Sequence, residues 1–144
     1  RSVSRGLGDV YKRQILRYWD AKRNDTCEEN ARDRNLRSQL QPALKCMTEQ
    51  YARDISAEEM AKLCHMSYSY FSRTFHRIMQ MTFREYLNHI RIWEAEKMLV
   101  STSLSITEIG GEVGFTTTSY FIKMFQSYKN VTPKQFRKMI AWKE

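Results

Sequence analysis

The sequence predicts an all-α fold of seven helices that contains two similar helix-turn-helix units. Three observations support this prediction. Apolar residues recur at intervals of three and four, and the alternation that is typical of a strand does not occur. Four segments have the pattern of an N-terminal capping box. One segment occurs twice, at 55–83 and again at 104–133.

The repeat preserves the order of its parts. Each copy has a cap, a short helix, a tight turn and a helix with an aromatic face. Tyr70 corresponds to Tyr120 at an offset of 50, whereas Ser67 corresponds to Thr116 at an offset of 49, so the second copy has one extra residue in a turn. A paired unit of this kind suits a ligand that itself repeats, and double-helical DNA is the obvious candidate.

The composition is that of a soluble globular domain. The chain has 144 residues, 42% of them hydrophobic and 28% charged, with a formal net charge of +8. No apolar run is long enough to span a bilayer. Residues 53–144 contain thirteen basic and nine acidic residues, a modest excess that is compatible with nucleic-acid binding.

Cysteine and histidine are not spaced as metal ligands. Cys27, Cys46 and Cys64 form neither a disulfide framework nor a zinc pattern, and a reducing cytoplasm is the simplest setting for them. His65 and His76 are eleven residues apart, without a group of carboxylates around them. We therefore expect no metal site, no cofactor and no catalytic residues.

The first part of the chain differs from the rest. Residues 1–14 resemble one reading frame of a sequencing adapter, and we expect them to be read-through at a truncated gene end; the alternative is a basic arm that touches DNA. Residues 15–37 are expected to be a linker together with the remnant of an upstream domain, and residues 38–144 the functional domain.

The first expected helix runs from Leu36 or Pro42 to Ala52, with Pro42 either starting or kinking it. One of its faces carries Leu40, Leu44, Met47 and Tyr51. Capping boxes then mark four helix starts, at Ser56/Glu59, Thr82/Glu85, Ser105/Glu108 and Thr132/Gln135, and Ser67 and Thr116 are candidate caps of two more. The expected helices are 57–64, 68–79, 83–100, 106–113, 117–129 and 133–141.

Each short helix is separated from the next helix by two or three residues, which is the spacing of a helix-turn-helix. Gly114 fills the turn in the second copy, where a left-handed backbone conformation is easiest for glycine. The matching residue in the first copy is His65. Because histidine tolerates positive φ better than most residues do, we predict positive φ at His65.

The second helix of each copy has two different faces. One face is aromatic and is expected to pack in the core: Phe71, Phe75 and Ile78 in the first copy, and Phe121, Phe125 and Tyr128 in the second. The opposite face has short polar side chains around one basic residue: Ser69, Ser72, Arg73 and His76, then Ser119, Ile122, Lys123 and Gln126. Such a face suits a helix in the DNA major groove, although a simply solvated face is the alternative.

At these residues the chain resembles the AraC/XylS family of bacterial transcription regulators. The resemblance covers about Gln39 to Ile140. Its most specific part is Val113-Gly114-Phe115 through Phe125, followed by Thr132-Pro133. It also includes Tyr70-Phe71-Ser72-Arg73-Thr74-Phe75, Phe83-Arg84-Glu85-Tyr86-Leu87 and Leu104-Ser105-Ile106. Gly110-Gly111 departs from the alanine-rich pattern of the family, which predicts a less stable second unit.

The resemblance implies two helix-turn-helix subdomains, at about 56–79 and 105–129, joined by the long helix 83–100. Their second helices would enter successive major grooves on one side of the DNA. The positions that read bases in the family fall on Ser69, Ser72, Arg73, Thr118, Ser119, Ile122 and Lys123. For the DNA backbone we expect Ser67, Arg77, Arg84, Thr116 and Lys129.

The expected function is therefore sequence-specific transcription regulation, as an activator, in the bacterial cytoplasm at the nucleoid. The expected partners are double-stranded DNA and RNA polymerase, with an effector or dimerisation through a missing N-terminal domain. The main alternative is a helical protein-interaction module. A DNA-repair methyl acceptor, an activity that is fused to this domain type in relatives, would need a cluster of activated cysteines, which the three scattered cysteines do not form.

Overall fold

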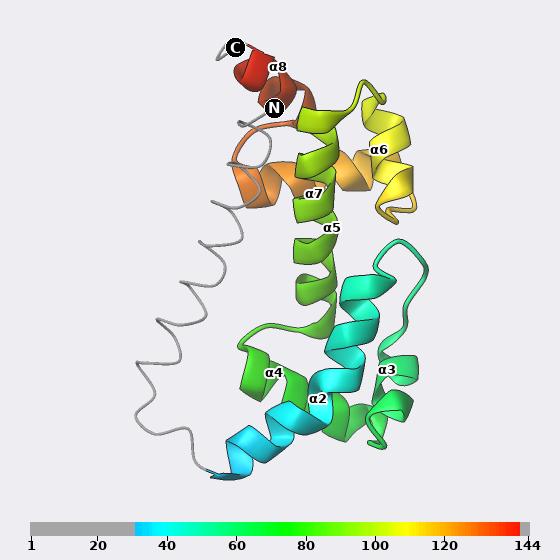
Figure 1. Ribbon diagram of the computed structural model, residues 1–144, viewed down its shortest axis with the longest axis vertical. Helices are drawn as coiled ribbons and strands as arrows, with labels where there is room; N and C mark the ends of the chain where they lie inside the picture. The colour runs from blue at the N-terminus through cyan, green and yellow to red at the C-terminus, as the bar shows by residue number, and fades with distance from the viewer. Residues whose placement is uncertain (1–30, 142–144) are drawn as a thin grey trace. The chain divides into compact units, whose positions relative to one another are not determined.

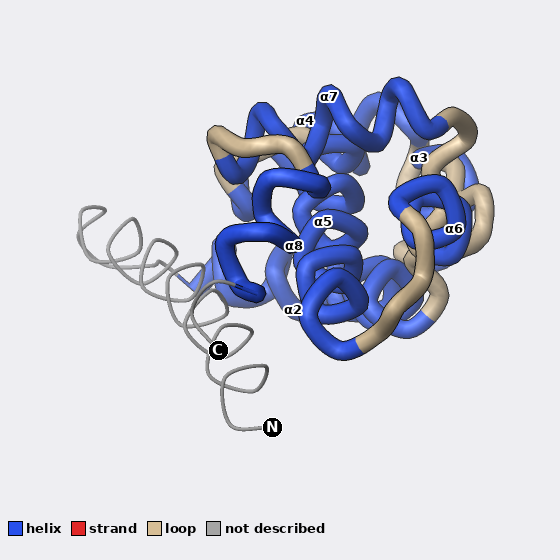
Figure 2. Tube along the Cα trace, turned by 90° about the horizontal axis from the view of Figure 1, so that it is seen from above, coloured by secondary structure: helices blue, strands red, loops and turns tan. Residues whose placement is uncertain are grey.

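The computed structural model describes residues 31–141, and within this range every regular element is a helix (Figures 1 and 2). Within residues 31–141 the predicted all-α class is confirmed, with seven helices. Most helix boundaries agree with the prediction to within one residue; the expectations for residues 1–30 lie outside the described residues. The helices are α2 (Ala31–Glu49), α3 (Ala57–Leu63), α4 (Tyr68–Met79), α5 (Phe83–Ser101), α6 (Ile106–Glu112), α7 (Thr118–Lys129) and α8 (Pro133–Ala141).

Helix α2 differs most from the prediction. It begins at Ala31, so residues 31–37 are helical although we expected them in the linker. The mixed charges of this segment were misleading, because alanine and arginine are good helix formers and Leu36 already lies on the buried face. Pro42 is inside the helix, which bends along its length in Figure 1, as expected where a proline cannot donate a hydrogen bond. The helix ends before Tyr51.

The described residues divide into two compact units, with the boundary between Leu87 and Asn88 inside α5. In the first unit, α2 packs on both α3 and α4, and these two helices pack on each other. The core between them is apolar: Leu40, Met47, Met60, Phe71 and Phe75 are completely buried. The Phe75 ring also meets Tyr86 edge-on, with 5.6 Å between the ring centroids.

In the second unit, the backbone of α7 approaches those of α6 and α8 closely. Its core contains Ile92, Ile109, Val113, Phe121 and Phe125, all completely buried. The Phe125 ring meets Phe136 of α8 edge-on at 5.6 Å. Helix α8 is also held to the end of α5, since the Arg137 guanidinium donates to the carbonyl oxygens of Leu99 and Thr102, each at 3.3 Å.

Helix α5 corresponds to α2, which extends the repeat to three helices. The buried residues Leu40, Ala43 and Met47 of α2 have the same spacing as Ile92, Ala95 and Leu99 of α5, at an offset of 52. The connection to the next helix comprises residues 50–56 in the first unit and only residues 102–105 in the second. Because these helices share an apolar spacing and little identity, the sequence comparison missed this part of the repeat.

Three of the four predicted capping boxes are complete. At α6, the Ser105 hydroxyl accepts from the Glu108 amide at 3.1 Å, and the Glu108 carboxylate accepts from the Ser105 amide at 2.8 Å. The same reciprocal pairs occur between Thr82 and Glu85 and between Thr132 and Gln135.

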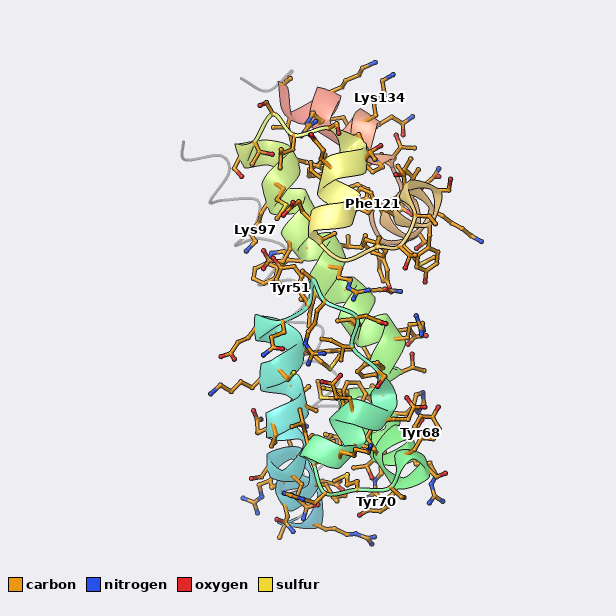
Figure 3. All side chains as sticks on the ribbon, turned by 90° about the vertical axis from the view of Figure 1, so that its right-hand side faces the viewer. Tyr51, Tyr68, Tyr70, Lys97, Phe121 and Lys134 are labelled. Atoms are coloured by element: carbon orange, nitrogen blue, oxygen red, sulfur yellow. The ribbon has the colours of Figure 1, made fainter. Side chains whose placement is uncertain are left out.

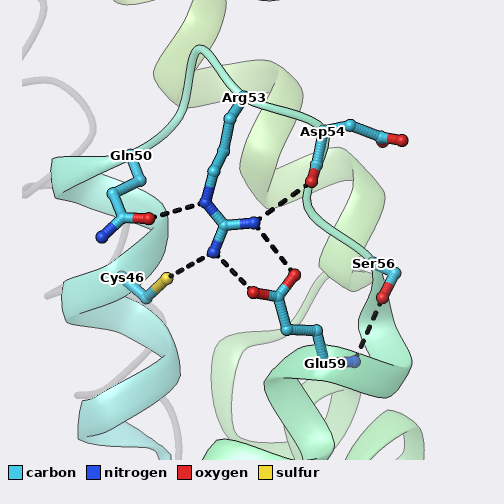
Figure 4. A network of polar contacts seen from close by, with 6 residues as sticks. All are labelled: Cys46, Gln50, Arg53, Asp54, Ser56 and Glu59. Atoms are coloured by element: carbon cyan, nitrogen blue, oxygen red, sulfur yellow. Dashed lines mark hydrogen bonds and ion pairs between the residues drawn. The ribbon is translucent and has the colours of Figure 1, made fainter.

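The start of α3 has a different arrangement (Figure 4). The Ser56 hydroxyl accepts from the Glu59 amide at 3.1 Å, but the Glu59 carboxylate binds the Arg53 guanidinium at 2.6 and 3.0 Å. Arg53 also donates to the Gln50 side chain at 2.6 Å and to the Cys46 sulfur at 3.5 Å. The hydrogen bond from Arg53 lowers the pKa of Glu59. Arg53 thus joins the longer connection of the first unit to both helices that it links.

The two glycines of α6 have different surroundings. A Cβ atom on Gly110 would lie 2.8 Å from the Cδ2 atom of Phe121, whereas one on Gly111 would meet nothing within 4 Å. The close packing of α6 on α7 therefore requires glycine at position 110. At Gly111, glycine only adds conformational freedom to the unfolded chain.

We expect Gly111→Ala to raise the free energy of unfolding by about 0.5–1 kcal/mol, because alanine is the better helix former. Gly110→Ala should instead lower it, by about 1–3 kcal/mol, since the completely buried Phe121 ring has little room to move. Urea titration followed by circular dichroism measures both values. Equal stabilisation by the two substitutions would contradict the close approach at Gly110.

Candidate nucleic-acid interface

The first helix-turn-helix is formed by α3, a short turn and α4. His65 in the turn has a φ of 56°, which confirms the predicted positive value. The Met66 amide then donates to the Ala61 carbonyl oxygen at 2.9 Å, and this bond brings the chain back across the end of α3. Ser67 caps α4 as predicted, because its hydroxyl accepts from the Tyr70 amide at 3.3 Å.

The second helix-turn-helix, formed by α6 and α7, has the same turn with Gly114 at a φ of 104°. Its cap is Thr117, whose hydroxyl accepts from the Tyr120 amide at 3.1 Å, so the prediction of Thr116 as the cap was wrong. A capping side chain reaches the amide three residues later, which makes Thr117 the counterpart of Ser67 at an offset of 50. Thr116 is therefore the extra residue in the turn of the second copy.

Both second helices also end in the same way, which the sequence analysis did not predict. Gln80 and Asn130 follow α4 and α7 with φ values of 60° and 62°, again at an offset of 50. Their backbone amides donate to the carbonyl oxygens of His76 and Gln126, at 2.9 and 2.8 Å. A left-handed residue at this position ends a helix sharply, and asparagine accepts the conformation more readily than glutamine does.

The predicted division of α4 and α7 into two faces agrees with the burial of their side chains. Phe71, Phe75 and Ile78 are buried in the first unit, and Phe121 and Phe125 in the second, where Tyr128 is half-buried. On the opposite faces, Ser69, Ser72, Arg73 and His76 are exposed, as are Ser119, Lys123 and Gln126. Ile122 and Thr118 are half-buried.

The predicted base-reading residues of each unit therefore lie together on one helix. The Nε atom of Arg73 donates to the Ser69 carbonyl oxygen at 3.3 Å, which places the base of the guanidinium along the helix surface. The side chains around Arg73 and Lys123 are short, so a flat or grooved partner can approach the helix backbone closely. This combination of small residues and one long donor matches the requirements of a major groove.

Four of the five residues predicted to contact the DNA backbone are accessible to solvent. Ser67, Arg84 and Thr116 are exposed. Arg77 is also largely exposed, although its guanidinium pairs with Asp33 of α2 at 3.0 Å. A surface pair of this kind contributes little stability and leaves the guanidinium accessible to another anion.

Lys129 fits a backbone role poorly. Its ammonium lies 2.7 Å from the Glu96 carboxylate, and the two side chains are 13% and 4% exposed. Burial raises the pKa of Glu96 and lowers that of Lys129, and each charge opposes the shift of the other. A lysine that is paired with a buried carboxylate is a poor partner for a phosphate. We therefore do not include Lys129 among the proposed contacts with the DNA backbone.

Exposed tyrosines flank these faces, and the sequence analysis did not single them out for DNA. Tyr68 and Tyr70, labelled in Figure 3, and Tyr120 are among the most exposed large apolar side chains. Tyr68 lies one helical turn before Ser72, on the same exposed side of α4. The Tyr120 hydroxyl is instead close to the Asn88 side-chain amide, at 3.4 Å.

Among residues 31–141, no group of histidine, cysteine and acidic side chains has the arrangement of a metal site. In the same range, no helix combines the length and the apolar character that crossing a membrane requires. Cys64 is buried, and burial raises the pKa of its thiol, which makes it less reactive.

Comparison with known proteins identifies the same domain. The family model described as a helix-turn-helix domain matches residues 60–139, which is more than half of the chain. The chain belongs to the AraC/XylS family. The matched range begins within α3 and covers the rest of both helix-turn-helix units described above.

Curated relatives are regulators that are longer than this chain. The bifunctional transcriptional activator/DNA repair enzyme AdaA of Bacillus subtilis is 33% identical over 94 residues, which are 65% of this chain and 44% of AdaA. The regulatory protein PocR of Salmonella typhimurium is 31% identical over 103 residues, 72% of this chain and 34% of PocR. The chain thus spans less than half the length of these relatives.

Solved structures have the same fold. The C-terminal domain of AraT, a response regulator from Geobacillus stearothermophilus, has a TM-score of 0.67 at 29% identity, covering 70% of this chain and 84% of that domain. The DNA-binding domain of AdpA, solved in complex with a target DNA, has a TM-score of 0.68 at 19% identity, covering 74% and 95%.

The caps give a stability prediction for the second unit. Thr117→Ala should lower the free energy of unfolding by about 1 kcal/mol, because the Tyr120 amide loses its acceptor. Thr116→Ala removes the same atoms from the preceding exposed position and should change it by less than about 0.5 kcal/mol. Thermal or urea unfolding compares the two, and a larger effect at Thr116 would contradict the assignment of the cap.

Proposed function

We propose that this chain binds double-stranded DNA in a sequence-specific manner, with α4 and α7 in successive major grooves. The main support for the proposal is that α4 and α7 have the same two faces. Each has a completely buried aromatic pair on one face and an exposed face with one basic residue among short side chains on the other. Membership of the AraC/XylS family supports the same function.

We call the exposed faces around Arg73 of α4 and Lys123 of α7 the reading faces, and α4 and α7 the reading helices. The two reading faces favour different bases. The planar guanidinium of Arg73 can donate two hydrogen bonds to the O6 and N7 atoms of guanine, which is the most common specific contact in the major groove. Lys123 at the corresponding position has a single ammonium and reads the same edge less strictly. Beside it, the half-buried Ile122 presents an apolar surface that suits the methyl group of thymine. Because of these differences, the two halves of the DNA site should have different sequences.

The remaining contacts in this proposal are with phosphates. Donors come from Arg77 on α4, from Arg84 at the start of α5, and from the hydroxyls of Ser67 and Thr116 in the turns before α4 and α7. The first amides of α4 and α7 add the positive end of each helix dipole. These contacts fix where the protein lies on the duplex without selecting a sequence. They also predict an affinity that falls steeply with salt, because bound counterions are released from DNA.

For the whole protein we propose transcription regulation, as an activator, in the bacterial cytoplasm at the nucleoid. Contact with RNA polymerase, and effector binding or dimerisation through a domain that precedes α2, belong to the same proposal. We also propose that the chain is not an enzyme. Although AdaA is named as a bifunctional repair enzyme, Cys64 here is buried with a raised pKa, the opposite of an activated thiol.

The proposed base contact of Arg73 can be separated from backbone contacts. On a duplex that the wild-type chain selects from a random library, Arg73→Ala should lower affinity by about 1–3 kcal/mol. The loss on random-sequence DNA should be much smaller. Arg84→Ala should instead lower both affinities alike and reduce the slope of log affinity against log salt by about one.

Fluorescence anisotropy over a range of salt concentrations measures both properties. Lys45→Ala, which removes an exposed charge from α2 outside the proposed contacts, is the control for net charge. Equal losses on selected and random DNA for Arg73→Ala would rule out base reading by this residue. Affinity without salt dependence would favour the protein-interaction alternative.

A further inference from the structure

The ion pair between Glu96 and Lys129 joins two helices of the second unit, α5 and the reading helix α7. Glu96 lies on α5 and Lys129 is the last residue of α7. Their charged atoms are 2.7 Å apart, and both side chains are largely removed from solvent. Removing two charges from water is costly, so a pair in this position needs an explanation other than stability.

The first unit shows that the fold does not require this pair. At the offset of 52 that relates α5 to α2, the counterpart of Glu96 is Leu44. At the offset of 50 that relates α7 to α4, the counterpart of Lys129 is Met79. Met79 is buried and Leu44 half-buried, so the same two positions are apolar in the other copy of the repeat.

Other contacts between α5 and α7 are polar as well. The side-chain amide of Asn88 is 3.4 Å from the Tyr120 hydroxyl and 3.7 Å from the Met124 sulfur. The rings of His89 and Tyr128 have centroids 4.3 Å apart. Among the described residues, the buried polar or charged side chains are Thr74, Asn88, Arg91 and Glu96, and all but Thr74 belong to α5.

Polar and apolar contacts constrain a helix differently. Apolar packing decides which face of a helix is buried but tolerates small shifts along and about the helix axis, whereas a buried ammonium has to remain within hydrogen-bonding distance of its carboxylate. Leaving either charge buried alone would be costly. A single buried polar group can for this reason fix the register of one helix against another. The last residue of α7 is well placed to do so, because the aromatic core holds the helix at Phe121 and Phe125.

We propose that Glu96 and Lys129 are positioning residues for the second reading helix. The pair fixes the rotation and register of α7 on α5 and thereby the direction in which Ser119, Ile122 and Lys123 face DNA. Neither residue touches DNA in this account. The inference rests on the proposed function, since it assigns a specificity role to residues that support one of the two readers.

The test replaces the pair by its apolar counterparts from the first unit, in the double variant Glu96→Leu/Lys129→Met of the full chain. This change leaves the net charge of the protein unaltered, so salt-dependent binding to random DNA should not change. We expect the urea midpoint of unfolding to equal or exceed that of the wild type. Discrimination between a selected and a random duplex should fall at least about tenfold, comparable to the loss of one good base contact.

A matched control is available on the same helix. Glu94 and Lys97 of α5 form a more exposed pair, at 2.9 Å, that does not involve α7. Glu94→Leu/Lys97→Met also preserves net charge and should leave discrimination at the wild-type value. Lys129→Met alone should lower the urea midpoint strongly, because Glu96 then remains buried without its counter-charge.

Two results would overturn the inference while leaving the proposed function intact. In one, the Glu96→Leu/Lys129→Met variant discriminates between the duplexes as well as the wild type does. In the other, it loses discrimination and stability together, which indicates a purely structural role. A wild-type chain that does not discriminate between selected and random duplexes would instead refute the proposed function, and the positioning role with it.

Discussion

The arrangement of this protein depends on the burial of two phenylalanines, one turn apart, on each reading helix. Phe71 and Phe75 of α4, and Phe121 and Phe125 of α7, are completely buried. Removing one such ring from water is worth about 1.5–3 kcal/mol, so a helix that rotated and exposed both would lose much of the stability of a small domain. Burial of one face therefore determines which residues the other face presents, and it does so in the same way in both copies.

The sequence was sufficient for the features that local chemistry determines. Aromatic spacing and hydroxyl-to-acid spacing located the helices, and the turn position of His65 predicted its positive φ. It was insufficient where the outcome depends on tertiary packing. Ala31 to Arg37 looked like a linker because helix propensity is weak evidence against a polar composition. Lys129 looked like a surface charge because its acidic partner lies thirty-three positions earlier, on α5.

The two copies of the repeat hold their connections and their reading helices by different contacts. The longer connection of the first unit is held by Arg53, which occupies the carboxylate of Glu59, whereas in the second unit Glu108 completes an ordinary capping box. The first unit has apolar residues, Leu44 and Met79, at the positions where the second has the buried pair of Glu96 and Lys129. Because these differences concern how α4 and α7 are supported, we expect the two helices to differ in stability and selectivity and the DNA site to be asymmetric.

In the proposed function, both units read bases from the major groove of one duplex. Methylation interference on a duplex selected by this chain detects the guanines whose N7 atoms must be unmodified for binding. We expect interference in two clusters of unlike sequence, with centres about 10 base pairs apart, corresponding to one helical turn. Interference confined to a single cluster, or protection of the backbone without any base-specific effect, would contradict it.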